Sequence, residues 1–167
     1  PYTDFTIGFW TAIETAVDAI GKLRDTSSSH SRANVIEVMG RHCGDLALYS
    51  ALAGGGESII VPEQPIDIDA ICKKAMRGRL RGKRHNLIIV AEGVGDVYEI
   101  AQAIVDKTHI DTRVTVLGHI QRGGSPSAPD RIMGSSMGRR AVELLIAGNS
   151  KKLVGVKNND IFEMDID

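Results

Sequence analysis

The chain has 167 residues, of which 43% are hydrophobic and 25% charged, enough to bury one sizeable core. Its formal net charge of −1 at pH 7 gives no overall attraction to nucleic acid or to an anionic membrane, so we expect neither partner. Cys43 and Cys72 are the only cysteines, and no apolar run approaches the length of a membrane span. This composition fits a reducing cytoplasm.

Segments with strand-like and helix-like patterns alternate along the chain. In the first segment, apolar residues from Phe9 to Leu23 recur at spacings of three and four, and a polar loop is expected at residues 26–31. Helices are expected at residues 6–25, 46–53, 67–80, 97–105 and 130–147, and strands at residues 34–39, 58–61, 86–91, 114–117 and 152–156. This order predicts an α/β, doubly wound fold, in which a mostly parallel sheet carries helices on both faces.

Residues 113–126 contain an apolar strand that leads into a glycine-rich turn. His119 and Arg122 lie in this turn, directly after the expected strand. Ligands bind at the carboxyl ends of the strands in open α/β sheets, so these donors are well placed to meet a phosphate. A surface turn with two solvated charges explains the same residues equally well.

Four arginines flank the expected strands: Arg32 and Arg41 lie at opposite ends of one strand, and Arg113 and Arg122 at opposite ends of another. A guanidinium group can hold a phosphate with two hydrogen bonds and stays charged. One pocket in one subunit cannot easily use all four arginines. The pattern therefore indicates either two sites or a site completed by a neighbouring subunit. Alternatively, two of the arginines only pair with surface carboxylates.

Other polar residues give weaker signals. Met39 is most simply a core residue at a strand end, and Cys43 a packing residue. The basic run Arg77, Arg79, Arg81, Lys83 and Arg84 has the usual character of a solvated helix end. No histidine or cysteine spacing indicates a structural zinc site, and the sequence contains neither a phosphate-binding P-loop nor a G-x-S-x-G nucleophile motif.

Five motifs in the same order resemble the bacterial ATP-dependent 6-phosphofructokinases. They lie at residues 4–9, 26–32, 38–41, 91–93 and 116–126. The resemblance implies a phosphofructokinase-like fold and transfer of the γ-phosphoryl group of ATP to the 1-hydroxyl of fructose 6-phosphate, a step of glycolysis. It also implies a homotetramer, with Mg²⁺ as the cofactor that accompanies ATP.

The resemblance also implies roles for individual residues. Arg41 is the expected catalytic residue, because it would stabilise negative charge on the phosphoryl group in flight. The expected substrate-binding residues are Arg32, Met39, Gly40, Arg41, Glu92, Arg113, His119 and Arg122. Of these, Arg32, Arg113, His119 and Arg122 would hold the 6-phosphate, and Arg32 and Arg113 would reach in from an adjacent subunit.

A second implied site binds ADP with magnesium, or phosphoenolpyruvate, as an allosteric effector. Its expected residues are Arg24, Gly55, Gly56, Glu57, Arg81, Lys83, Arg84 and His85. Gly55 and Glu57 would lie next to the effector-bound magnesium. Part of the basic helix end thus has a competing role, whereas solvation still accounts for Arg77 and Arg79.

The sequence departs from the family pattern in two ways: motifs are missing, and one residue differs. The ATP-binding glycine motifs and the aspartate that deprotonates the sugar hydroxyl would lie before Pro1, so we expect a fragment that is inactive alone. Trp10 stands where the family usually has aspartate. We expect residues 1–128 to form the fructose 6-phosphate and effector-binding domain, and residues 129–167 to pack into the nucleotide-binding domain.

Three alternatives remain at this point. The first is a pyrophosphate-dependent phosphofructokinase, because the residues that select the phosphoryl donor lie mostly outside this chain. The second is a non-catalytic sugar-phosphate or effector-binding module. The third is a doubly wound domain with scattered surface arginines, which would bind no sugar phosphate.

Overall fold

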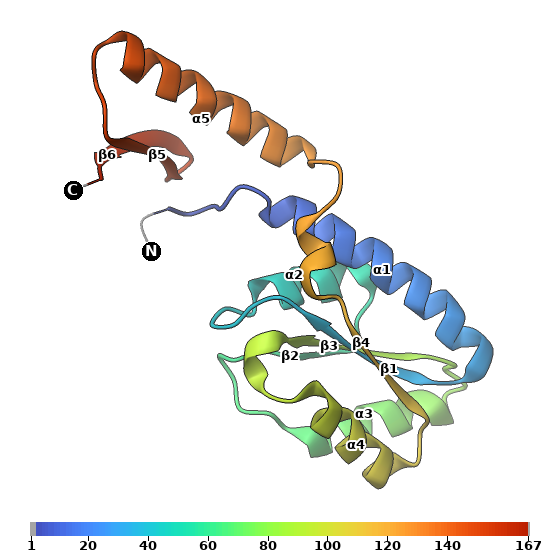
Figure 1. The fold of residues 1–167 in the computed structure, drawn as a ribbon. Helices are drawn as coiled ribbons and strands as arrows, with labels where there is room; N and C mark the ends of the chain where they lie inside the picture. Colours follow the sequence, from blue (N-terminus) through green and yellow to red (C-terminus); the bar gives the residue numbers. More distant parts are fainter. Residues whose placement is uncertain (1–2, 167) are drawn as a thin grey trace. The chain divides into compact units, whose positions relative to one another are not determined.

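The computed structural model describes residues 3–166 and divides into two compact units (Figure 1). The larger unit consists of residues 12–124. The smaller unit combines the first 11 residues with residues 125–167. The functional division at residue 128 stays a prediction, since it concerns what each part binds.

The larger unit is built on a parallel sheet of four strands. These are β1 (Ala33–Val38), β2 (Ser58–Ile60), β3 (Asn86–Ala91) and β4 (Thr112–Val116), in the order β2-β3-β1-β4. Every residue of β3 is buried, as expected for an apolar run covered on both faces. The parallel arrangement brings the carboxyl ends of all four strands to one edge of the sheet.

Helices cover both faces of this sheet, which confirms the predicted doubly wound α/β fold (Figure 1). Helices α1 (Phe9–His30) and α2 (Asp45–Gly54) pack on one face, through a core that includes Ile20, Ala47 and Ile89. Helices α3 (Ile68–Leu80) and α4 (Val97–Thr108) pack on the other face, around Ile88 and Ile104. The short 3₁₀ turns η1 (Glu92–Val94) and η2 (Gly118–Arg122) follow β3 and β4.

The prediction of a polar loop at residues 26–31 was wrong, because α1 continues to His30. Three hydroxyl groups in this stretch donate to the carbonyl four residues earlier: Thr26 to Lys22, Ser27 to Leu23 and Ser28 to Arg24, at 2.6–3.1 Å. These hydrogen bonds satisfy the hydroxyl groups inside the helix. From the sequence, serine and threonine hydroxyls are expected to bond to the backbone in a loop and so to disfavour the helix. The helix ends before Ser31, which has a positive φ of 53°.

The smaller unit contains α5 (Ala128–Ile146) and the antiparallel hairpin of β5 (Lys152–Lys157) and β6 (Asp160–Asp165). Strand β6 was not predicted. It follows a two-residue turn in which Asn158 and Asn159 both have positive φ, a conformation that favours a tight hairpin. None of the helices in the described part of the chain combines the length and apolarity that a membrane crossing requires.

A buried carboxylate, Asp130, holds the start of α5 against the chain around Gly8 and Thr11. Its oxygens accept hydrogen bonds from the N–H groups of Gly8 and Thr11, both at 2.8 Å, and from the hydroxyls of Thr11 and Ser127. Burial by itself would raise the pKa of Asp130, but these four donors stabilise the anion and lower the pKa below its usual value.

Candidate functional site

Most of the predicted sugar-binding residues lie at the carboxyl edge of the parallel sheet. Met39, Gly40 and Arg41 directly follow β1, and Glu92 directly follows β3. His119 and Arg122 lie in η2, which follows β4. The side chains of Arg41, Glu92, His119 and Arg122 are exposed, so the structure gathers three cationic or hydrogen-bonding donors and one carboxylate at one accessible edge.

Close backbone packing joins the turns after β1 and β3. The N–H of Gly93 donates to the carbonyl of Gly40 at 3.3 Å. A Cβ atom on Gly93 would lie only 1.8 Å from the carbonyl oxygen of Arg41. Gly93 therefore allows an approach that no other residue allows, and Glu92 is held next to the backbone of Arg41.

The turn after β4 is joined to the turn after β1 by the buried side chain of Gln121. Its Oε1 accepts from the N–H of Met39 at 3.4 Å, and its Nε2 donates to the carbonyl of Gly118 at 3.1 Å. Sequence analysis did not single out Gln121. The burial of an amide in a turn whose histidine and arginine are exposed has no signature in the sequence alone.

Carboxylates also gather near this edge. Burial raises the pKa of Glu37, which lies in β1, and the nearby carboxylates of Glu92 and Asp96 raise it further. The edge therefore carries both donors for an anionic group and acceptors for hydroxyl groups. Such a combination suits a phosphorylated sugar.

Arg32 and Arg113 lie at the opposite, amino edge of the sheet, where Asp111 bridges them. The Nε of Arg32 lies 2.6 Å from one oxygen of Asp111, and the Nε of Arg113 lies 3.4 Å from the other. The structure thus brings these two arginines together, but a strand length away from Arg41, His119 and Arg122. The sequence analysis did not name Asp111, although a carboxylate beside two arginines at adjacent strand starts is a usable signal.

The predicted effector residues also lie at the amino edge, and several surround Glu57. Lys83 Nζ lies 2.5 Å and His85 Nε2 3.7 Å from Glu57 Oε1, while the N–H of Leu87 donates to Oε2. Arg24 donates to the carbonyl of Gly54 at 3.5 Å, next to Gly55 and Gly56. Arg81 and Arg84 are exposed on the turn after α3.

A cavity of about 220 Å³ places Arg32 beside part of the predicted effector set. Its lining consists of Ser31, Arg32, Ala75, Arg79, Gly82, Lys83, Arg84, His85, Asn86 and Ile110. The lining is strongly basic, so an anion is the ligand class that it would attract. Ser28 connects α1 to this region, because its Oγ lies 3.1 Å from His85 Nδ1.

Glu57 and Gly55 do not form a metal site by themselves. Both carboxylate oxygens of Glu57 already face donors, and within residues 3–166 no group of three or more histidine, cysteine or acidic residues could hold a metal ion. Magnesium is commonly bound through one or two carboxylates and the phosphates of a ligand. Any magnesium here would therefore depend on oxygens supplied by the effector.

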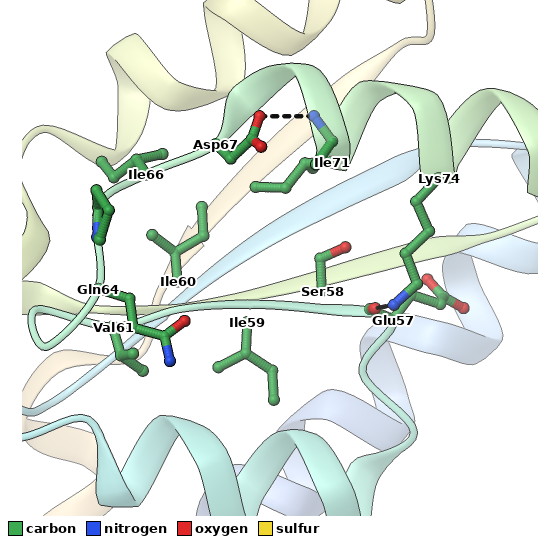
Figure 2. Close-up of a pocket in the computed structure, with 12 residues that line it drawn as sticks. Glu57, Ser58, Ile59, Ile60, Val61, Gln64, Ile66, Asp67, Ile71 and Lys74 are labelled. Carbon is green, nitrogen blue, oxygen red and sulfur yellow. Dashed lines mark hydrogen bonds between the residues drawn. The ribbon is translucent and has the colours of Figure 1, made fainter.

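Another cavity, of about 380 Å³, lies between the free edge of β2 and α3 (Figure 2). Ile59, Ile60, Ile66 and Ile71 contribute much of its lining, and Glu57 is the one predicted site residue among the lining residues. The side chain of Lys74 donates to the backbone carbonyl of Glu57 at one end of this cavity (Figure 2). The lining also includes Glu57, Asp67 and Lys74, but it contains no arginine and so lacks the phosphate-binding groups of the two sheet edges.

In the smaller unit, Trp10 contacts Phe9 with the ring centroids 5.5 Å apart, in an edge-to-face arrangement. It also lines a mostly apolar cavity of about 420 Å³ together with residues of α5 and the hairpin, among them Ile132 and Val156. Trp10 thus has a packing role in the smaller unit.

Comparison with known proteins agrees with this geometry. The family model described as phosphofructokinase matches residues 1–145. An ATP-dependent 6-phosphofructokinase of Alkaliphilus metalliredigens is 61% identical over 166 residues, which cover 99% of this chain and 52% of that protein. One from Clostridium botulinum (strain Loch Maree / Type A3) is 59% identical with the same coverage. The chain spans about half the length of the curated relatives it matches.

Solved structures show the same fold. The phosphofructokinase of Saccharomyces cerevisiae matches with a TM-score of 0.89 and 36% identity, over 99% of this chain and 24% of that one. A pyrophosphate-dependent phosphofructokinase of Nitrosospira multiformis matches with a TM-score of 0.75 and 21% identity, over 99% of this chain and 48% of that one. The family match and the two turns joined at the carboxyl edge of the sheet confirm the sequence resemblance, and the chain belongs to the phosphofructokinase family.

Proposed function

We propose that this chain is the sugar-phosphate-binding part of an ATP-dependent 6-phosphofructokinase, which converts fructose 6-phosphate into fructose 1,6-bisphosphate in the cytoplasm. The observation that carries the proposal is the carboxyl edge of the sheet, where Arg41, His119 and Arg122 lie exposed beside Glu92. ATP is the proposed donor because the relatives at 59–61% identity are named as ATP-dependent enzymes.

The proposed roles follow from the chemistry of these side chains. Arg122 and His119 donate hydrogen bonds to the 6-phosphate, because both project from the turn after β4. Glu92, together with the backbone at Met39 and Gly40, contacts the sugar. Arg41 stabilises the charge that develops on the transferring phosphoryl group.

Arg32 and Arg113 complete the 6-phosphate site of a neighbouring subunit in this proposal. The support is geometric: both arginines lie at the sheet edge opposite to Arg122, so one sugar phosphate cannot contact all three within a subunit. A symmetric oligomer, a tetramer in the whole enzyme, brings opposite edges of two subunits together.

The basic amino edge is the proposed effector site, for ADP with magnesium or for phosphoenolpyruvate. Arg24, Lys83, Arg84 and His85 are the cations that would meet phosphate or carboxylate oxygens there. Mg²⁺ that enters with ATP would neutralise the phosphates of the donor during transfer. In this proposal the residues of this chain bind and orient the sugar phosphate, Arg41 stabilises the charge of the phosphoryl group, and the amino edge binds the effector.

Calorimetric titration of the 167-residue chain with fructose 6-phosphate tests the proposal. We expect binding that Arg122→Ala abolishes and that Arg77→Ala, an exposed arginine of α3, preserves. A coupled assay with ATP should detect no fructose 1,6-bisphosphate, because the residues implied for ATP binding and deprotonation lie outside this chain. Absence of binding would contradict the proposed sugar-phosphate site, and turnover by the isolated chain would contradict the proposal that ATP binding and deprotonation need residues outside it.

A further inference from the structure

Gln121 reverses the usual burial pattern within η2. Its side chain is 0% exposed, whereas the apolar side chain before it, Ile120, is 73% exposed. An amide costs free energy to bury unless its donor and acceptor are both used. The reversal therefore indicates that the hydrogen bonds of Gln121 have a task that an apolar residue could not perform.

The two hydrogen bonds of Gln121 join segments that lie far apart in the sequence. Oε1 accepts from the N–H of Met39, which is 82 positions away at the exit of β1. Nε2 donates to the carbonyl of Gly118, at the start of its own turn. One side chain thus connects the turn that carries His119 and Arg122 to the turn that carries Gly40 and Arg41.

Backbone and threonine hydrogen bonds fix the two ends of the same turn. Before it, the N–H of Leu117 donates to the carbonyl of Glu37 at 3.0 Å. After it, the hydroxyl of Thr15 donates to the carbonyl of Gly123 at 2.9 Å. Gln121 lies between these two anchors, and its amide links the middle of the turn, which carries His119 and Arg122, to the residue after β1.

We propose that Gln121 is a positioning residue for the sugar-phosphate site. Its amide holds the phosphate-binding turn at a fixed separation from the sugar-contacting turn, so that one ligand can contact both. This inference rests on the proposed function. It goes beyond it by assigning the spacing of the two subsites to a residue that touches neither the phosphate nor the sugar.

The proposal predicts that a substitution of Gln121 changes the affinities for two ligands by different amounts. Fructose 6-phosphate spans both turns, whereas inorganic phosphate at this edge needs only the donors of η2. Phosphate that binds at the amino edge is the part that remains in Arg122→Ala, and this part is subtracted before the variants are compared. Loss of the Gln121 amide should therefore weaken fructose 6-phosphate about tenfold, as expected for a lost buried hydrogen bond, and inorganic phosphate by about twofold or less. A role in stability alone would weaken both ligands equally or neither.

The test uses the 167-residue chain and three variants. Gln121→Met removes both hydrogen bonds at similar volume, and Gln121→Asn keeps an amide that is too short to reach both partners, which guards against a variant that fails to fold. Gln64→Met is the matched control, because Gln64 is exposed and lies near β2. Calorimetric titration measures the affinity for each ligand, and thermal unfolding confirms that each variant is folded.

Hydrogen exchange provides a readout that does not depend on ligand binding. The amide hydrogen of Met39 should exchange faster in Gln121→Met and Gln121→Asn than in the parent chain and in Gln64→Met. If the parent chain binds neither ligand, the proposed function fails, and the exchange of Met39 alone decides whether Gln121 positions the turn. Unchanged exchange, or equal weakening of both ligands, would overturn the proposal.

Discussion

Both edges of the parallel sheet carry cationic side chains, but the edges differ in whether these side chains form ion pairs. At the amino edge the cations face carboxylates: Arg32 and Arg113 share Asp111, and Lys83 pairs with Glu57. At the carboxyl edge, no ion pair to Arg41 or Arg122 is found within residues 3–166. A phosphate at the carboxyl edge meets available donors, whereas an anion at the amino edge must compete with a resident carboxylate.

The two edges also differ in what holds them. The carboxyl edge is fixed by uncharged groups, namely the Gly93–Gly40 backbone contact and the Gln121 amide. At the amino edge, ion pairs add to backbone hydrogen bonds such as that from the N–H of Ala33 to the carbonyl of Asp111, and salt and neighbouring charges modulate the ion pairs. This difference suits a constant substrate site at one edge and an adjustable effector site at the other.

The largest effect is expected at Gly93, because the close contact between two turns of the carboxyl edge requires a residue without a Cβ atom. Gly93→Ala would place a methyl group 1.8 Å from the carbonyl oxygen of Arg41, so the backbone of one turn must move. We expect a loss of about 3 kcal/mol in unfolding free energy, as for overpacking of a tight contact, together with loss of fructose 6-phosphate binding. Chemical denaturation and titration measure the two effects.

Gly21→Ala is the control for this prediction. Gly21 lies within α1, and nothing lies within 4 Å of an added Cβ. Because alanine favours a helix, we expect up to about 1 kcal/mol of added stability. Equal behaviour of the two alanine variants would show that the turns after β1 and β3 do not depend on close backbone contact.

At the amino edge, Glu57→Gln should have the next largest effect. The substitution removes the ion pair to Lys83 but leaves an acceptor for the N–H of Leu87. The carboxylate is only 11% exposed, so we expect a loss of about 2 kcal/mol in unfolding free energy. Denaturant titration measures it, and Glu14→Gln, on the exposed face of α1 beyond its first turn, should leave stability unchanged.

The strands and most helices could be predicted from the sequence because their signals are local. The apolar run of β3 gave its bounds, Asn86–Ala91, without error, because a central strand is buried on both faces. The end of α1 was missed because Ser27 and Ser28 bond within the helix. Strand β6 was missed because acidic residues interrupt its apolar positions, although the pair Asn158-Asn159 before it is a usable turn signal.

The position of the candidate site in the fold was predictable to the extent that its residues directly follow strands. Arg41, Glu92 and Arg122 could be found because parallel strands place their carboxyl ends together. Gln121 could not, because its importance depends on a partner 82 positions away in the sequence. Asp111 has a usable signal in its position two residues before Arg113, but its bond to Arg32 joins residues 79 positions apart. Such pairings exist only once the strand order is known.

Asp111→Asn tests whether a resident carboxylate limits anion binding at the amino edge. Without its charge, Arg32 and Arg113 can both turn to an external anion, so we expect about fivefold tighter binding of inorganic phosphate, a change typical of an exposed ion pair. The Arg122→Ala background removes the contribution of the carboxyl edge to the titration. Asp106→Asn removes the same charge from α4 and should have no effect. Weaker binding in Asp111→Asn would show instead that the carboxylate orients the two arginines for the anion.

The smallest effect is expected for a substitution of Glu37, which lies near the carboxyl edge of the sheet. Apart from burial, the groups that shift its pKa are carboxylates, not cations. Burial, followed by the charges of Glu92 and Asp96, raises the pKa of Glu37, so the folded state holds its proton more tightly than the unfolded state. Ionised Glu37 therefore costs stability above its folded pKa, and this cost disappears as the pH falls below the ordinary pKa of glutamate. Glu37→Gln should add about 0.5 kcal/mol near pH 7, because water screens a half-buried group, and nothing near pH 3. Urea unfolding at both pH values measures the difference, and a gain that is equal at both would locate the cost in packing instead of in charge.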